Sequence, residues 1–288
     1  MRLESLPSNG GSTILNEATI DSSRGAKVEF LDVWFRYPSR ETPVLSGLNM
    51  TIEEGQFAAI VGPSGCGKTS IISLLERFYK ANSGMITFDD HDIEEIGLCD
   101  HRKTISLVAQ EFNLFNGTIR ENTLVGVDET ETTENSDRRM FEACRDAGIH
   151  DFVMSLPEGY DTVIGSKGVL LSGGQRQRIS IARALVRSPR LLLLEEATSN
   201  LDSETEKQIQ ETFERTRKGR TMVVVAHRLA TVKNADVIFV LGDGRVQECG
   251  THTSLLQRRG VYHNMAYPSR IIVVLGVIKY AVSDVPSV

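Results

Sequence analysis

Two glycine-rich stretches of this sequence have the residue types of anion-binding sites. The first is Gly62-Pro63-Ser64-Gly65-Cys66-Gly67-Lys68-Thr69, which fits the pattern G-x-x-x-x-G-K-[ST] of a phosphate-binding loop. Glycines allow backbone N–H groups to converge on an anion, and a following helix adds the positive end of its dipole. In such a loop Lys68 reaches the β- and γ-phosphates of a nucleoside triphosphate, and the Thr69 hydroxyl ligates Mg²⁺. The predicted nucleotide-binding residues are Gly62, Ser64, Gly65, Cys66, Gly67, Lys68, Thr69 and the adjoining Ser70.

The second stretch, Leu171-Ser172-Gly173-Gly174-Gln175, places a hydroxyl and two glycines at the predicted start of a helix. Ser172 is a suitable N-cap, and the combination again suits an anion. Since the chain already has one complete phosphate-binding loop, a second half-site makes sense only opposite the nucleotide of another molecule. That helix is predicted to carry Ile179, Ala182 and Leu185 on one face and Arg176, Gln177 and Arg183 elsewhere.

The phosphate-binding loop has the sequence context that such a loop requires. Phe57–Val61 is a continuous apolar run, typical of a central strand covered on both faces. After the loop, apolar residues recur at helical spacing at Ile71, Leu74, Leu75 and Phe78. This order of strand, glycine loop and helix disfavours the alternative interpretation, a glycine-rich turn that carries a surface lysine.

The flanking segments predict further elements. Residues 1 to about 26 are rich in Ser, Gly, Asn and Thr without periodicity, which indicates a flexible linker. Helical signals dominate between residues 111 and 189. Alternating apolar residues indicate antiparallel strands, first at Val28 and Phe30 and then at Leu48, Met50 and Ile52.

Apolar runs at 191–194, 222–226 and 237–241 indicate further buried strands, and Gly242-Asp243-Gly244 indicates a hairpin turn after the last of them. The sequence therefore predicts an α/β fold. It has a P-loop NTPase core with a mixed sheet, an N-terminal antiparallel β-subdomain and an inserted helical subdomain at about 111–187.

Composition excludes several other classes. The formal net charge of −6 argues against a nucleic-acid partner. The basic cluster Arg215, Arg217, Lys218 and Arg220 is interpreted as a solvated helix end. The cysteines, Cys66, Cys99, Cys144 and Cys249, are scattered and predict neither a zinc site nor a disulfide framework. The longest apolar run, 271–278, is far short of the ~20 residues that span a bilayer.

The phosphate-binding loop, the stretch at 171–175 and a Leu-rich strand that ends in acidic residues together resemble the nucleotide-binding domain of an ATP-binding cassette (ABC) transporter. The resemblance covers residues 28 to about 262. Within the family, the chain resembles most the exporter-type B-subfamily, the multidrug or P-glycoprotein-like group. It implies a domain at 27–265 and leaves an atypical tail at 266–288. The diagnostic runs are Phe35-Arg36-Tyr37-Pro38-Ser39-Arg40, Leu75-Glu76-Arg77-Phe78-Tyr79 and Leu156-Pro157-Glu158-Gly159-Tyr160-Asp161-Thr162.

The resemblance implies roles for the two carboxylates that end the Leu-rich strand. Glu196 matches the glutamate that polarises the attacking water. Glu195 stands where the family usually has an aspartate that serves the Mg²⁺ shell. Because one extra methylene moves the carboxylate toward the metal, and Mg²⁺ tolerates geometric error badly, two interpretations stay open. The domain is either an ATPase with possibly reduced turnover or a catalytically impaired nucleotide-binding module.

The resemblance also implies roles for single residues elsewhere. Gln110 resembles the Q-loop glutamine that contacts Mg²⁺ and water, and His227 resembles the switch histidine that contacts the γ-phosphate. Tyr37 resembles the aromatic that stacks on adenine, and Asp202 lies in a run that resembles the D-loop of the dimer contact. The implied catalytic residues are thus Lys68, Gln110, Glu196 and His227, and the implied Mg²⁺ ligands are Thr69, Gln110 and Glu195.

The implied cofactors are ATP and Mg²⁺, and the implied assembly is a head-to-tail homo- or heterodimer. In it, nucleotides are sandwiched between the phosphate-binding loop of one partner and residues 172–175 of the other. Such domains normally follow membrane helices, so we expect the transmembrane domains either to be supplied by another chain or to have been lost. With a transmembrane partner the domain is expected at the cytoplasmic face of a membrane, and otherwise in the cytosol. A soluble ABC ATPase of translation or DNA repair is disfavoured because the chain has neither a second cassette nor a long heptad insertion.

Overall fold

The computed structural model describes residues 24–111, 113–127, 131–165, 171–195, 211–217, 219–226 and 232–267, together with the backbone of 273–274 and 277–278. Three of the predicted site residues, Glu196, Asp202 and His227, lie outside the described residues. Among the helices that the structure describes, none is both long and apolar enough to cross a membrane.

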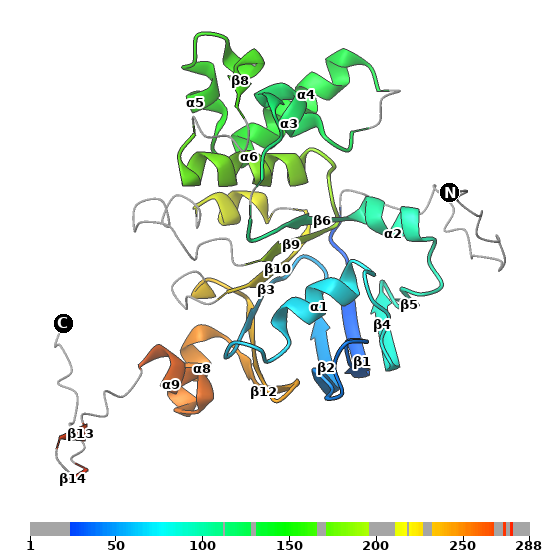
Figure 1. Cartoon of the computed structure of the whole chain (residues 1–288), viewed down its shortest axis with the longest axis vertical. Helices are drawn as coiled ribbons and strands as arrows, with labels where there is room; N and C mark the ends of the chain where they lie inside the picture. The colour runs from blue at the N-terminus through cyan, green and yellow to red at the C-terminus, as the bar shows by residue number, and fades with distance from the viewer. Residues whose placement is uncertain are drawn as a thin grey trace.

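A six-stranded mixed sheet forms the core, as predicted (Figure 1). Its strand order is β12-β11-β3-β10-β9-β6, and every neighbouring pair is parallel except β11 with β12. All residues of β3 and β10 are buried, because each strand has a neighbour on either side and apolar side chains on both faces. The strands are β3 (Phe57–Val61), β6 (Ile105–Val108), β9 (Leu191–Glu195), β10 (Thr221–Val225), β11 (Val237–Gly242) and β12 (Arg245–Gly250).

A second, antiparallel sheet lies beside the first, in the order β2-β1-β4-β5. The alternating residues pair as expected, with Val28 opposite Ile52 and Phe30 opposite Met50. The backbone N–H of Ala26 donates to Oγ1 of Thr221, and that hydroxyl donates to the Ala26 carbonyl, so the residues just before β1 are tied to the six-stranded sheet. The strands are β1 (Val28–Phe35), β2 (Leu45–Ile52), β4 (Ser83–Phe88) and β5 (His91–Asp92).

Helix α1 (Lys68–Leu75) follows the phosphate-binding loop and packs against β9. It ends earlier than the apolar spacing predicted, because Arg77 adopts a left-handed conformation with φ 53°. Phe78 is therefore 59% exposed instead of buried on the helix face. Further helices around the two sheets include α2 (Leu98–Thr104), α8 (His252–Arg258) and α9 (Val261–Ala266), residues 211–216 are also helical, and a short pair β13 (Val273–Val274) and β14 (Val277–Ile278) follows.

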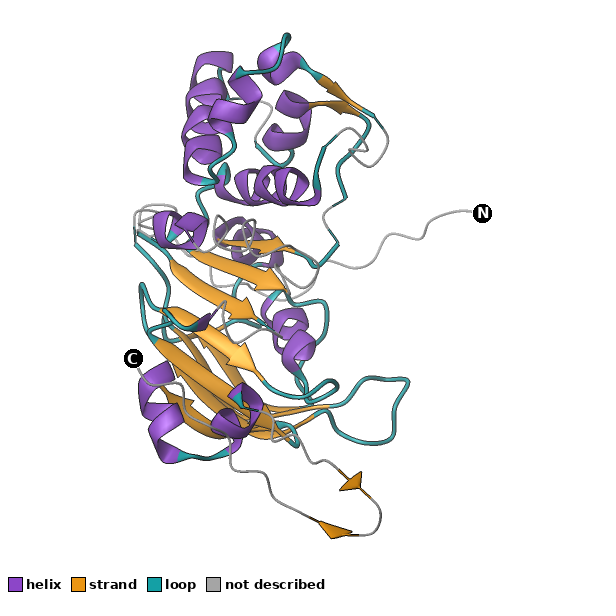
Figure 2. Ribbon diagram, turned by 90° about the vertical axis from the view of Figure 1, so that its left-hand side faces the viewer, coloured by secondary structure: helices purple, strands orange, loops and turns teal. Residues whose placement is uncertain are grey.

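The predicted helical insertion forms the opposite end of the molecule from the antiparallel sheet (Figures 1 and 2). Its core is continuous with one face of the six-stranded sheet, since Ile179 and Leu185 belong to the same buried cluster as Leu192 and Val224. Its elements are β7 (Gly117–Thr118), α3 (Ile119–Leu124), α4 (Thr133–Asp146), α5 (His150–Met154), a 3₁₀ turn (Gly159–Asp161), β8 (Val163–Ile164) and α6 (Gly173–Leu185).

Two polar side chains are more buried than the sequence analysis predicted. Gln177 on α6 is 0% exposed, although the helical pattern separated it from the apolar face. Arg220, interpreted as part of a solvated helix end, has Nε and Nη1 buried with no hydrogen-bond partner among the described residues, and burial lowers its pKa. Residue type alone did not predict the burial of these polar groups.

The turn between β11 and β12 is a two-residue hairpin turn, as predicted. Asp243 and Gly244 both have positive φ, 52° and 72°, which suits the right-handed twist of the strands. The Gly244 carbonyl accepts a hydrogen bond from the Ser46 N–H at 3.1 Å. A Cβ atom at Gly244 would lie 2.5 Å from the carbonyl oxygen of Val44, so the turn packs directly on the chain that enters β2.

Candidate nucleotide-binding site

The six-stranded sheet brings the phosphate-binding loop and the acidic strand end to the same edge. Ile60 of β3 pairs with Val225 of β10, and Val225 pairs in turn with Glu195 of β9. Neighbouring strands lie about 4.8 Å apart, so Glu195 is about 10 Å from Ile60 across the sheet. Gly62, the first residue of the loop, follows Ile60 after one intervening residue, Val61. The half-buried carboxylate of Glu195 therefore stands at the carboxyl edge where the loop begins.

The phosphate-binding loop curls closely on itself. Lys68, which is 5% exposed, donates from Nζ to the carbonyl oxygens of Gly62 at 2.8 Å and Pro63 at 2.9 Å. Gly62 is required by space, because a Cβ atom there would lie 2.5 Å from the Leu241 carbonyl oxygen and 2.7 Å from Sγ of Cys66. The loop thus presents a single ammonium group at the start of α1.

A cavity of about 430 Å³ joins this loop to the segment that contains Tyr37. The Tyr37 hydroxyl and the Ser70 hydroxyl lie 3.0 Å apart, which links the two walls. The lining residues are Tyr37, Arg40, Val44, Ser64, Gly65, Gly67, Lys68, Thr69 and Ser70. The structure therefore brings Tyr37 together with most of the predicted phosphate-binding residues, at the volume of a small-molecule site.

Sequence reasoning missed two lining residues, Arg40 and Val44. Both belong to the segment between β1 and β2 that also contains Tyr37. The Arg40 N–H donates to the Tyr37 carbonyl, and the Val44 N–H donates to the Phe35 carbonyl, which folds the segment back over the cavity. The available sequence signal is the positive charge of Arg40, three residues after Tyr37.

Thr69 lines the cavity, while Glu195 and Gln110 stand at the same sheet edge. Gln110 is exposed and follows β6, whose Val108 pairs with Leu194 of β9. In the part of the chain that the structure describes, no three His, Cys, Asp or Glu side chains gather to hold a metal by themselves. Mg²⁺ takes few protein oxygens and completes its shell with phosphates and water, so a hydroxyl, an amide and one carboxylate fit that ion.

The stretch at 171–175 lies apart from this cavity, at the start of α6. The Ser172 hydroxyl accepts from the Gln175 N–H at 3.2 Å, and the Gln175 side-chain oxygen accepts from the Ser172 N–H at 2.8 Å. This reciprocal capping box gives α6 the predicted start at Ser172. None of these residues lines the cavity, as far as its lining is formed by described residues.

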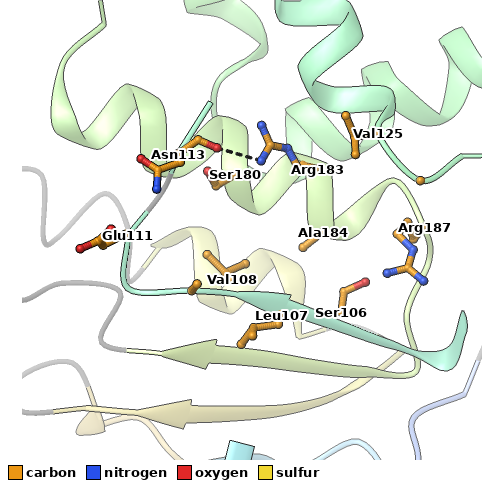
Figure 3. A pocket seen from close by; sticks show the side chains of 12 residues that line it. Ser106, Leu107, Val108, Glu111, Asn113, Val125, Ser180, Arg183, Ala184 and Arg187 are labelled. Atoms are coloured by element: carbon orange, nitrogen blue, oxygen red, sulfur yellow. Dashed lines mark hydrogen bonds between the residues drawn. The ribbon is translucent and has the colours of Figure 1, made fainter. Parts of the chain in front are cut away.

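A separate groove of about 310 Å³ runs between β6, the segment that follows it, and the last turns of α6 (Figure 3). Arg183 spans it, with hydrogen bonds to the carbonyl oxygens of Asn113 at 3.1 Å and Asn122 at 2.9 Å. Burial lowers the pKa of Arg183. Within the helical insertion, Arg183 of α6 thereby joins the segment after Gln110 to α3.

The fold and the cavity define a P-loop nucleotide-binding domain. The ABC transporter family matches the chain over residues 45–199, and the chain belongs to this family. It is 56% identical to the ABC transporter BEA3 of Gibberella fujikuroi over 255 residues, which are 88% of this chain and 19% of that protein. It is 52% identical to the ABC multidrug transporter mdr1 of Aspergillus fumigatus over 247 residues, 85% of this chain and 18% of that protein.

Solved structures agree with this assignment. A bacterial Atm1-family ABC exporter with ATP bound matches with a TM-score of 0.77 and 40% sequence identity, over 85% of this chain and 42% of that chain. The predicted ABC nucleotide-binding domain and its P-loop fold are therefore confirmed. The chain spans about a fifth of the length of the curated relatives that it matches.

Proposed function

We propose that this chain binds and hydrolyses ATP and drives a membrane exporter through ATP-dependent head-to-tail dimerisation. The observation that carries the proposal is the single cavity of about 430 Å³ that Tyr37 shares with Lys68 and Thr69. An aromatic ring at one wall suits adenine, and a cation with converging N–H groups at the other suits a triphosphate.

Binding exchanges hydrogen bonds within the loop for bonds to phosphate. The Lys68 ammonium group, which donates to the Gly62 and Pro63 carbonyls, turns to the β- and γ-phosphate oxygens. Thr69, Gln110 and Glu195 would hold Mg²⁺, which neutralises the charge that develops on the phosphates. The position of Glu195 at the sheet edge where the loop begins supports this assignment.

Hydrolysis is assigned to residues that follow two of the core strands. Glu196, the residue after β9, polarises the attacking water, and His227, close behind β10, contacts the γ-phosphate. Both lie outside the described residues, and the placement of Glu195 and Val225 at one sheet edge supports their convergence. Gln110 at the end of neighbouring β6 completes the set of catalytic residues with Lys68.

The position of the stretch at 171–175 supports the proposed dimer. Its hydroxyl and its helix N-terminus suit an anion, yet the stretch lies away from the cavity of its own chain. We infer that Ser172, Gly173, Gly174 and Gln175 contact the ATP of a second nucleotide-binding domain, with Asp202 at the dimer contact. A homodimer or a heterodimer satisfies this geometry.

The exporter role rests on the relatives, which are named as transporters. The domain would work together with transmembrane domains, at the cytoplasmic face of their membrane. A nucleic-acid partner is disfavoured by the net charge of −6.

Substitution Glu196→Gln tests the proposal. The amide keeps the shape of the side chain but cannot polarise water, so ATP stays bound and the closed dimer accumulates. Gel filtration with MgATP should show a dimer for Glu196→Gln, and the further substitution Lys68→Ala should return it to the monomer. A Glu196→Gln protein that remains monomeric at high concentration and turns over normally contradicts both the role of Glu196 and the sandwich dimer.

Glu195 favours a second candidate, a nucleotide-binding module with impaired hydrolysis. This residue ends β9 where the family usually has the shorter aspartate. The main chain of β9 is held in register with β10 up to Glu195, which leaves the side chain alone to absorb the extra methylene. In that case ATP binding and dimerisation persist while turnover is low.

A further inference from the structure

Tyr79 lies behind the ring of Tyr37 in an arrangement of three aromatic side chains. We propose that Tyr79 is a positioning residue that holds the Tyr37 ring in the orientation needed to stack on adenine. This inference rests on the proposed ATP-binding function. Tyr79 contacts the ring of Tyr37 but is absent from the described lining of the nucleotide cavity, so it would act on the ligand only through Tyr37.

The three rings contact one another pairwise. The centroids of Tyr37 and Tyr79 are 5.0 Å apart with an interplanar angle of 87°, and those of Tyr37 and Phe35 are 4.8 Å apart at 73°. Phe35 and Tyr79 close the triangle at 5.6 Å. Edge-to-face pairs at these distances are attractive because a positive ring edge meets a negative ring face.

The hydroxyl of Tyr37 is held as well, by Ser70 at 3.0 Å. The ring therefore has supports from both ends of the same helix, since Ser70 lies in the first turn of α1 and Tyr79 follows its last turn. Rotation of the Tyr37 ring would break the pair with Tyr79 and the hydroxyl contact together. The ring is preorganised in one orientation, which reduces the entropy that ligand binding would otherwise cost.

The turn after α1 separates Tyr79 from its neighbour Phe78. Arg77 has φ 53°, and the N–H of Phe78 donates to the Ser73 carbonyl at 2.9 Å. Phe78 is 59% exposed beneath the Arg102 guanidinium, whereas Tyr79 packs on Tyr37 and lines a different cavity of about 210 Å³. Two adjacent aromatics thus have distinct surroundings, and Phe78 provides a matched control.

Substitution Tyr79→Leu in the full chain should weaken ATP binding selectively. Calorimetric titration with MgATP is expected to show affinity lower by about five- to tenfold, a part of what base stacking on an aromatic contributes. Affinity for magnesium tripolyphosphate, which has no base, should stay unchanged and thereby report an intact phosphate-binding loop. Tyr79→Phe should keep parent affinity for both ligands, and so should Phe78→Leu.

A double substitution isolates the pathway through Tyr37. In the Tyr37→Leu background, Tyr79→Leu should lower ATP affinity no further, because the stacking ring is already absent. The inference is overturned if Tyr79→Leu leaves ATP affinity unchanged, or lowers tripolyphosphate affinity by the same factor, or acts additively with Tyr37→Leu. A parent chain that binds tripolyphosphate and ATP equally, or neither, refutes instead the proposed nucleotide site.

Discussion

The hydroxyl oxygen of Tyr37 lies 3.0 Å from that of Ser70, which ties the segment before β2 to the first turn of α1. One of these residues belongs to the wall that suits a base, and the other adjoins the loop that suits phosphates. The distance between the two walls is therefore set by side-chain contact within the protein. A ligand that spans the cavity meets walls that are already joined.

Removal of the Lys68 ammonium group should abolish hydrolysis and weaken ATP binding. A hydrogen bond to a charged group contributes about 1.5–3 kcal/mol, so Lys68→Ala should lower ATP affinity by about ten- to a hundredfold. Calorimetry and a phosphate-release assay measure the two effects. Lys80→Ala is the control, since that side chain is 73% exposed and pairs only at the surface with Glu94 among described residues. If Lys68→Ala retained the turnover of the parent, the assignment of residues 62–69 as the phosphate-binding loop would be wrong.

Shortening Glu195 should raise turnover. A misplacement of about 1 Å at a catalytic centre costs on the order of a hundredfold in rate, and aspartate restores the shorter reach toward Mg²⁺. We expect Glu195→Asp to increase Mg²⁺-dependent phosphate release with little change in ATP affinity, because Tyr37, Lys68 and the loop amides remain. If the variant hydrolyses ATP no faster than the parent, Glu195 is a tolerated substitution and the impaired-module alternative loses its support.

Alkylation of Cys66 should block nucleotide binding, and MgATP should protect it. Cys66 is only 8% exposed and its Sγ lies 3.9 Å from Lys68 Nζ, so an added group fills the loop. The exposed Cys99 and Cys249 must first be changed to serine, because they react without regard to nucleotide. Mass spectrometry then follows labelling of Cys66. Equal labelling with and without MgATP would place the nucleotide elsewhere.

Glu76, at the C-terminal end of α1, should make stability depend on pH. Burial raises its pKa above the ordinary value of 4.5, against the opposing charges of Arg102 and Arg187. A carboxyl whose folded pKa is raised favours folding when protonated, and this contribution is lost as pH rises through the folded pKa. Glu76→Gln, which is neutral at every pH, should therefore unfold at a higher temperature than the parent at pH 7.

The gain from Glu76→Gln should shrink as pH falls toward 4.5 and below, where the parent carboxyl is protonated in both states. The exposed Glu53→Gln is the control for a general change in net charge. Thermal melts followed by circular dichroism across pH 4 to 8 would reveal the difference, and a constant offset between Glu76→Gln and the parent at all pH values would contradict it.

The strands could be predicted well from the sequence. A strand buried on one face has alternating apolar residues, and a strand buried on both faces has a continuous apolar run. The alternation at Val28 and Phe30 gave an antiparallel strand, and the apolar run at Phe57–Val61 gave a central one. The end of α1 escaped prediction, since spacing cannot reveal the left-handed turn at Arg77 that exposes Phe78.

In the candidate site, too, some residues could be predicted from the sequence and others could not. Lys68 and Thr69 were predicted because their spacing alone defines a phosphate-binding loop. The packing of Tyr79 on Tyr37 depends on how two sheets and a helix meet, which no local pattern encodes. Likewise, Val44 reaches the cavity only because its backbone N–H is bonded to Phe35 across the turn.

Gly244, far along the sequence from the phosphate-binding loop, packs on the segment that lines the candidate nucleotide cavity. The hairpin turn has no room for a side chain against the Val44 carbonyl, and its own carbonyl holds the Ser46 N–H. A larger residue at 244 would push the segment that carries Val44 into the cavity or away from it. An inherited or engineered change in this remote hairpin would therefore present as a defect in ATP affinity, with the phosphate-binding loop itself unaltered.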